Sequence, residues 1–192
     1  MLTTNYQLLS TPIISLIAAL DENRVIGKGN RIPWHIKDDL IHFKNLTLHH
    51  TVIMGRTTFD SLLGYYKKSG KPLPERRHVI VSRDTNYRVD LPECFIAHSI
   101  DEALKIAIKK ESEAARLANT SVTEMGEVFI SGGASIFEQT IAQADMLHLT
   151  IIHGKFDGDT HFPDYSHFTK VVGEKRKTAP DGLSYTFLDL AK

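Results

Sequence analysis

The chain is short of several features that mark whole classes of protein. Its 192 residues include a single cysteine, Cys94, so an internal disulfide is excluded. That cysteine lies in the apolar run 94–97, which indicates a buried strand and fits a reducing compartment. Lys plus Arg and Asp plus Glu number 23 each, so the formal net charge is zero. Because nucleic-acid backbones require clustered basic residues, we expect no nucleic-acid partner.

Targeting, membrane and metal signals are also missing. Residues 1–12 lack the basic start, apolar stretch and small-residue cleavage site of a secretory signal, and no apolar run is long enough to cross a bilayer. We therefore expect a cytoplasmic protein with no membrane partner. The ten histidines show no metal-ligand spacing, so we expect no metal, with His49, His50 and the histidines of 161–167 at the surface. Gly-x-Gly-x-x-Gly and Walker patterns are absent, which excludes an ordinary Rossmann or P-loop site.

The apolar residues that are present form an α/β pattern. Short runs without strict alternation predict strands covered on both faces, and they span 13–20, 51–54, 78–82, 94–97, 128–131 and 146–152. Helix-type spacing fills 37–49, 56–63, 99–117 and 134–142. Two late segments, 169–177 and 182–190, meet at a Pro-Asp-Gly turn and predict a C-terminal antiparallel hairpin. The fold class is therefore α/β, with a mixed, mostly parallel sheet flanked by helices.

The chain shows no internal repeat and no linker. We expect residues 13–192 to form a single domain and residues 1–12 to be an N-terminal extension. Two stretches look inserted. Residues 64–70 are expected to lengthen a loop, and the charged, Ala-rich residues 109–125 are expected to extend one helix into a solvated loop.

The segment 21–35 joins the first strand to the first helix and contains Gly27, Gly29 and Pro33, so it predicts a long surface loop. Loops of this length often cover active sites, although a merely long connection also fits. The only tryptophan, Trp34, ends this loop. A lone aromatic of this kind is more often plain core than functional.

Asp39 occupies an unexpected position for a charged residue. With Phe43 and Leu46 it falls at i, i+4 and i+7, so the three share one helical face, while Asp38, His42 and Asn45 share a polar face. An acid in the first helical turn is also favoured by the helix dipole, so the spacing alone leaves both interpretations open. An inward carboxylate without a cation one turn away is costly unless a ligand pairs with it. A planar amidine-like group could do so with two parallel hydrogen bonds.

Three strand ends look suited to anions. Residues 51–58 turn through Gly55 into a helix that begins with Arg56, Thr57 and Thr58. Residues 128–135 enter a second helix through the paired glycines 132 and 133, and the strand 79–82 ends on Ser82 and Arg83. Each signal alone is usually only turn chemistry. Together they predict a pyrophosphate plus an additional phosphate, which favours NADPH over NADH.

The run 71–77 contains two prolines, one apolar residue and the cations Arg76 and Arg77. It suits a ligand with an aromatic body and a carboxylate tail, although a solvated basic turn fits equally well.

Read in order, these motifs resemble bacterial dihydrofolate reductase from about residue 13 to the C-terminus. The segments are ISLIAA at 14–19, VIG at 25–27, IPW at 32–34, DL at 39–40, FK at 43–44, VIMGRTTF at 52–59, PLP at 72–74, SGG at 131–133 and GDTHFP at 158–163. The resemblance implies an eight-stranded sheet, a monomer, dihydrofolate and antifolate inhibitors as ligands, and NADPH-dependent hydride transfer to C6 with protonation of N5, in tetrahydrofolate synthesis.

The resemblance also implies residue roles. Asp39 would bind the pterin 2-amino group and N3, with Thr150 nearby and Trp34 holding a water. The substrate would contact Phe43, Leu62, Leu73, Phe137, the carbonyls of Ile17 and Ser131, and Ala19, with Arg76 on the glutamyl α-carboxylate and Arg77 as the alternative. The cofactor would contact Ala19, Ile26, Ile32 of the lid, Gly55, Arg56, Thr57, Thr58, Ser82, Arg83, Ser131, Gly132, Gly133, Ala134, Ser135, Ile136 and Phe137, with a cis peptide at Gly132–Gly133.

Two residues depart from the family pattern. Phe137 stands where many bacterial members have Tyr, and Ser131 replaces a usual Ile or Val, which bears on inhibitor preference rather than on the reaction. Two rival functions stay open. One is the related enzyme that reduces a ribosylated pyrimidine of riboflavin synthesis, which should lack the Trp34–Asp39 pair. The other is a catalytically silent NADPH- or folate-binding module.

Overall fold

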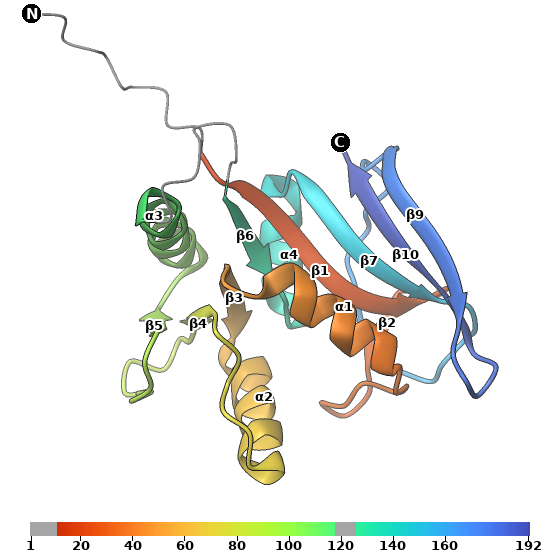
Figure 1. The fold of residues 1–192 in the computed structure, drawn as a ribbon, viewed down its shortest axis with the longest axis horizontal. Coiled ribbons are helices and arrows are strands. Elements are labelled where there is room, and N and C mark those ends of the chain that lie inside the picture. Colours follow the sequence, from red (N-terminus) through yellow and green to blue (C-terminus); the bar gives the residue numbers. More distant parts are fainter. Residues whose placement is uncertain (1–10, 118–125) are drawn as a thin grey trace, which may run out of the picture.

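The computed structural model describes residues 11–117 and 126–192 (Figure 1). One eight-stranded sheet runs in the order β5-β4-β3-β6-β1-β7-β10-β9. Its strands are β1 Ile13–Asp21, β3 Thr51–Gly55, β4 Arg77–Val81, β5 Cys94–Ala97, β6 Glu127–Ile130, β7 Met146–Ile152, β9 Lys170–Thr178 and β10 Ser184–Ala191. Strands β2 Val25–Gly27 and β8 Thr160–His161 form a separate pair. The predicted mixed sheet is confirmed.

The pairing directions follow from how the strands are connected. The pairs β4–β5, β3–β4, β3–β6, β1–β6 and β1–β7 are parallel, whereas β10 is antiparallel to both β7 and β9. Parallel neighbours need a crossover, and antiparallel ones a short turn. The β9–β10 hairpin at one side of the sheet in Figure 1 closes through a backbone bond of 2.8 Å from Ala179 N to Leu183 O, with Gly182 at φ 90°. The predicted C-terminal hairpin is confirmed.

The helices cover both faces of the sheet. They are α1 Lys37–Thr47, α2 Arg56–Ser69, α3 Ile100–Leu117, α4 Ala134–Thr140 and the 3-10 turn η1 Ile141–Gln143. One core cluster joins Leu16, Ile53 and Val79 of the sheet to Ala103 of α3 and Ile136 of α4. A second joins Ile17, Val52, Met54 and Phe129 to the partly buried Phe43 of α1 and Leu62 of α2. Because side chains alternate along a strand, α1 and α2 lie on one face and α3 and α4 on the other.

The segment 64–70 is not a loop, so that prediction was wrong. Helix α2 continues through Gly64 to Ser69 and ends at Gly70, whose φ of 65° places it in the left-handed region. The Gly70 N–H reaches back to the carbonyls of Lys67 and Tyr66, which is a usual way to close a helix. Glycine weakens a helix interior without ending it, so Gly64 is tolerated here.

Two other predicted boundaries shift, whereas the predicted end of the helix at residue 117 is confirmed. Helix α1 ends at Thr47 rather than 49, because Leu48 is extended and His49 has a φ of 66°. Part of the expected loop 21–35 is strand β2, which pairs with β8 and buries Val25. The insertion at 109–125 is helical as far as Leu117, and its remainder, 118–125, lies outside the described residues, as do residues 1–10 of the expected N-terminal extension.

Candidate functional site

Asp39 lies where the helical spacing placed it. It sits in the first turn of α1, is half-buried, and shares its face with Phe43 and Leu46, which pack against the second core cluster. Burial raises the pKa of the Asp39 carboxyl above its ordinary value, and the hydroxyl of buried Thr150 on β7 partly opposes this by hydrogen bonding. Among the described residues, Lys177 pairs with the neighbouring Asp38 and not with Asp39. Asp39 is therefore a carboxylate without a cationic partner among the described residues.

Trp34 is buried in the loop just before α1. Its ring meets Phe156 edge-on with centroids 5.1 Å apart, and it packs with Ile36, Ile152 and Tyr185 in a third cluster that Ala19 adjoins. Its indole Nε1 is buried and has no hydrogen-bond partner among the described residues. A buried indole N–H normally finds an acceptor, so this atom fits the predicted contact with an ordered water.

Four of the predicted substrate residues come together, whereas Phe137 and Ala19 belong to the first and third clusters. Ile17 is a buried member of the second core cluster, and Phe43, Leu62 and Leu73 pack against it as partly buried residues. They come from a strand, two helices and a loop. Leu40, next to Asp39 on α1, is 44% exposed although apolar, and the sequence analysis did not single it out. From the sequence alone, Leu40 could have been noticed only as an apolar residue that directly follows the candidate carboxylate.

The two neighbouring arginines differ sharply in their surroundings. Arg76 is buried, its guanidinium carbon lies 4.8 Å from the Phe43 ring centroid, and its Nε lacks a partner among the described residues. Burial lowers its pKa. Arg77 instead donates to Glu111 at 2.9 Å and to Thr51 at 2.9 Å. The Nε of Arg76 is thus an unused donor beside the predicted substrate contacts, while its guanidinium also bonds to Tyr66, and Arg77 is committed to Glu111 and Thr51.

The two predicted anion-binding turns are neighbours in space. The N–H of Gly55, which precedes α2, donates to the carbonyl of Gly132 over 2.7 Å, and the Gly132–Gly133 peptide is cis, as expected. Neither α2 nor α4 has a side-chain cap at its first turn, so the N–H groups there remain available. A Cβ on Gly133 would lie 3.3 Å from the Thr58 hydroxyl, and one on Gly132 would lie 2.9 Å from the Phe137 ring. Gly132, with a φ of 104°, therefore requires glycine, whereas the space at Gly133 is merely tight.

The remaining predicted cofactor residues differ in how exposed they are. Arg56, Thr57, Arg83 and Ser135 are exposed; Ser82 and Ile136 are buried; Ile26, Thr58, Ser131 and Ala134 are half-buried; and Ile32 is 57% exposed. The Arg56 guanidinium lies 3.5 Å from the Asp84 carboxylate and over the Tyr87 ring. The buried hydroxyl of Ser131 has no partner among the described residues.

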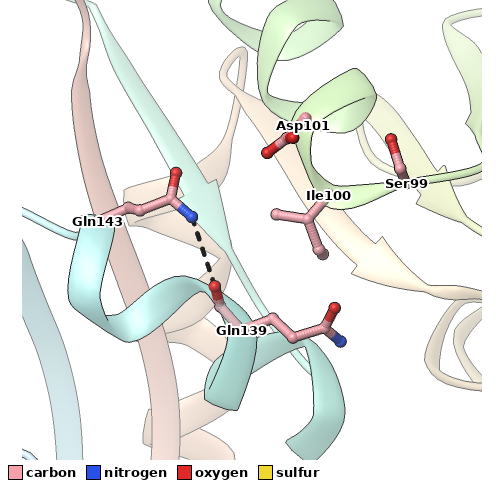
Figure 2. Close-up of a pocket in the computed structure, with 5 residues that line it drawn as sticks. All are labelled: Ser99, Ile100, Asp101, Gln139 and Gln143. Carbon is pink, nitrogen blue, oxygen red and sulfur yellow. Dashed lines mark hydrogen bonds between the residues drawn. The ribbon is translucent and has the colours of Figure 1, made fainter.

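A hollow of about 340 Å³ lies at the same edge of the sheet (Figure 2). Ser99, Ile100 and Asp101 at the start of α3 line one side, and Gln139 and Gln143 line the other. It adjoins the cofactor residues, since Gln139 donates to Ser135 and the His98 ring bonds to the Ser82 carbonyl at 2.9 Å. The sequence analysis missed these residues, although Ser99 follows a parallel strand at its carboxyl end, where ligands usually bind.

Other kinds of site were also sought among the described residues. Residues 11–117 and 126–192 contain no group of three or more His, Cys, Asp or Glu side chains able to hold a metal ion. None of the helices in the part of the chain that the structure describes is long and apolar enough to span a membrane.

The fold and the site together define a class of protein. It is an α/β protein in which the ends of β3 and β6 suit a dinucleotide. A carboxylate, Asp39, lies among apolar side chains and suits a polar heteroaromatic ring. The family model "Dihydrofolate reductase" matches residues 13–192, and the chain belongs to that family.

Individual relatives agree with this family. The chain is 42% identical over 153 residues to dihydrofolate reductase type 3 of Salmonella typhimurium, covering 80% of each. It is 36% identical over 182 residues to the dihydrofolate reductase of Staphylococcus aureus, covering 93% of this chain and 98% of that one. A solved dihydrofolate reductase from Enterococcus faecalis, complexed with NADP(H) and RAB-propyl, matches with a TM-score of 0.73 and 27% identity over 93% of this chain and 95% of that one.

Family membership defines the activity. The chain is an oxidoreductase that reduces 7,8-dihydrofolate to 5,6,7,8-tetrahydrofolate with NADPH, a reaction of one-carbon metabolism.

Proposed function

We propose that Asp39 binds and orients the pterin ring of dihydrofolate. The observation that carries this proposal is a half-buried carboxylate, without a cationic partner among the described residues, whose pKa burial raises. The 2-amino group and N3 of a pterin present two parallel donors, which match the two oxygens of one carboxylate. Thr150 stands beside Asp39 as a second polar contact, and Trp34 holds the water that serves N5.

The rest of the substrate would lie against the apolar side chains. Phe43, Leu62, Leu73 and Leu40 are available for the ring and the benzoyl group, with Ala19, Phe137 and the carbonyls of Ile17 and Ser131 near the pterin. The free Nε of Arg76 favours this residue, rather than Arg77, as the partner of the glutamyl α-carboxylate. Antifolate inhibitors would occupy the same positions.

The residues at the strand ends fit NADPH. The glycines at 55, 132 and 133 leave room for close backbone approach, and the uncapped start of α2 with Arg56, Thr57 and Thr58 supplies donors for phosphate oxygens. Ser82, Arg83, Ala134, Ser135 and Ile136 complete this cradle, and Ile26 and Ile32 would cover the nicotinamide end. The hollow between α3 and α4 combines Gln139 and Ser99 with apolar Ile100, which suits the adenine end.

The reaction divides between the ligands and the protein. When bound, NADPH supplies the hydride that reduces C6 of the pterin. Asp39 orients the ring and polarises it toward protonation at N5, while the immediate proton donor is water held near the Trp34 indole. The exposed Ile32 on the loop between β2 and α1 would exclude bulk water when a ligand is present.

The wider setting is also a proposal. We infer that residues 13–192 form a single domain preceded by an N-terminal extension, and that the protein acts as a monomer in the cytoplasm. The continuous eight-stranded sheet supports a single domain, and the single cysteine supports a reducing compartment.

Paired arginine variants test the proposed substrate site. NADPH oxidation would be followed with dihydrofolate and with a dihydropterin that lacks the benzoyl-glutamate tail. Arg76→Gln should raise the KM for dihydrofolate roughly ten- to hundredfold, because a charge-assisted pair is lost, and leave the KM for the tailless substrate within about threefold. Arg77→Gln is the comparison variant: it removes the buried partner of Glu111 and so lowers stability, but it should leave both KM values of the folded protein near wild type.

Two outcomes would reject parts of this proposal. Equal effects of Arg76→Gln on both substrates would remove Arg76 from the carboxylate site. No turnover of dihydrofolate by the wild-type chain, despite tight NADPH binding, would favour a silent binding module, and turnover of a ribosylated pyrimidine instead would favour the riboflavin-pathway relative.

A further inference from the structure

Asp38, the neighbour of Asp39, is hydrogen-bonded to the C-terminal hairpin. Its Oδ2 accepts a hydrogen bond from the Lys177 ammonium at 2.7 Å and one from the Tyr185 hydroxyl at 2.9 Å. Lys177 and Tyr185 are directly opposite each other in the β9–β10 ladder, and Tyr185 is fully buried. The sequence pattern placed Asp38 on a polar helix face, and the structure adds that this face meets the C-terminal hairpin.

A second contact lies one turn further along the helix. The His42 ring stacks on Phe187 with centroids 4.0 Å apart and planes inclined by 32°. Phe187 is opposite Thr150 in the β7–β10 ladder, and Thr150 is the hydroxyl beside Asp39. The first part of α1 is thus held by β9 and β10, and β10 pairs with β7, which carries Thr150.

The charges around Asp38 and Asp39 are also defined by the structure. The hydrogen bonds from Lys177 and then Tyr185 hold the pKa of Asp38 below its ordinary value, so Asp38 stays ionised. The other charged or titratable groups that act on this turn are Lys37, Asp39 and His42. Asp189 and His148 in turn act electrostatically on His42. The positive charge of Lys177 therefore offsets the negative charge of Asp38, the residue next to Asp39.

We propose that Asp38, Tyr185 and Lys177 are positioning residues for the reaction: they fix the helical turn that carries Asp39, and Lys177 neutralises Asp38 so that Asp39 interacts with the pterin as a lone carboxylate. This inference rests on the proposed role of Asp39. None of the three residues touches the substrate in this arrangement. They act through the position and the electrostatic surroundings of their neighbour.

Single-turnover hydride transfer, followed as loss of NADPH absorbance from pH 5 to 9 with saturating substrate, tests the charge. Lys177→Met leaves Asp38 uncompensated, and a nearby negative charge favours protonation, so the apparent pKa of hydride transfer should rise by roughly half a pH unit. The double variant Asp38→Asn with Lys177→Met should return it to the wild-type value. Lys175→Met is the matched control, since Lys175 lies on the same strand, is exposed, and carries the same charge; it should leave the profile unmoved.

Tyr185→Phe tests the geometry without changing charge. It removes one hydroxyl and should lower the hydride-transfer rate roughly three- to tenfold, with no shift of the pH profile and no change in NADPH affinity. Superimposable profiles for Lys177→Met and Lys175→Met, or a wild-type rate for Tyr185→Phe, would overturn the inference. Near-normal hydride transfer by Asp39→Asn would instead reject the proposed function itself, so the two failures are distinguishable.

Discussion

At the scale of single residues, Glu111 shows how this chain accommodates a buried charge. Its carboxylate on α3 accepts hydrogen bonds from the His50 ring at 2.8 Å, the Thr51 N–H at 2.8 Å and the Arg77 guanidinium at 2.9 Å. Burial alone would raise its pKa, but these three donors outweigh burial and lower the pKa to about 2. Glu111 therefore joins the end of α3 to the starts of β3 and β4.

Replacing Glu111 with Gln should lower the free energy of unfolding at pH 7 by about 3 kcal/mol, because Arg77 loses its buried counter-charge. A depressed carboxyl pKa contributes stability that is present above the unfolded pKa of about 4.5 and is lost as the pH falls through about 2. The difference between wild type and variant should therefore fall to roughly half by pH 3.

Urea unfolding at pH 7 and pH 3 measures this difference. Glu113→Gln is the control on the same helix, since Glu113 pairs with Lys109 and Lys110 at the surface and should change stability by less than about 0.5 kcal/mol. A Glu111→Gln effect that is the same at both pH values would contradict the ionised buried carboxylate.

The contacts of Glu111 also show what could not be predicted from the sequence. Spacing within one helix predicted that Asp39 faces inward, because only the helical period was needed. His50 was expected at the surface, yet it bonds to Glu111, which is 61 positions away. Asp38 was predicted only to lie on a polar helix face, and its partners Lys177 and Tyr185 lie 139 and 147 positions away. Contacts of this range depend on strand order, which local pattern does not contain.

At the scale of elements, helix α2 is longer than its pattern indicated. Gly64 lies within the helix and Gly70 ends it in a left-handed conformation, and a Cβ added at either position would meet no atom within 4 Å. The two glycines therefore differ in backbone conformation and not in packing. This makes them a matched pair for substitution by alanine.

Gly64→Ala should raise the free energy of unfolding by roughly 0.5–1 kcal/mol, because alanine favours a helix interior over glycine. Gly70→Ala should lower it by roughly 1 kcal/mol, because alanine is strained at a positive φ. Thermal or urea unfolding of both variants gives the signs. If both variants lost stability, residue 64 would not be helical and the loop predicted from the sequence would be restored.

At the scale of the whole molecule, the site depends on the order of strands. Asp39 comes from α1, Thr150 from β7 and Trp34 from the loop before α1, and the cofactor cradle joins the ends of β3 and β6. The sequence identified most strands, the hairpin and the ordered set of motifs. It could not choose between Arg76 and Arg77, because partners from distant segments distinguish them: Phe43 of α1 for Arg76 and Glu111 of α3 for Arg77. It also missed the hollow between α3 and α4, which two distant segments form.

Hydride transfer by Asp39→Asn is the measurement that tests the proposed role of Asp39 most directly. Single-turnover loss of NADPH absorbance with saturating dihydrofolate at pH 7 would be compared with wild type. The rate should fall roughly a hundred- to ten-thousandfold and recover as the pH is lowered, because a substrate already protonated at N5 no longer needs the polarising carboxylate. A rate within about tenfold of wild type at pH 7 would contradict a binding, orienting and polarising role for Asp39.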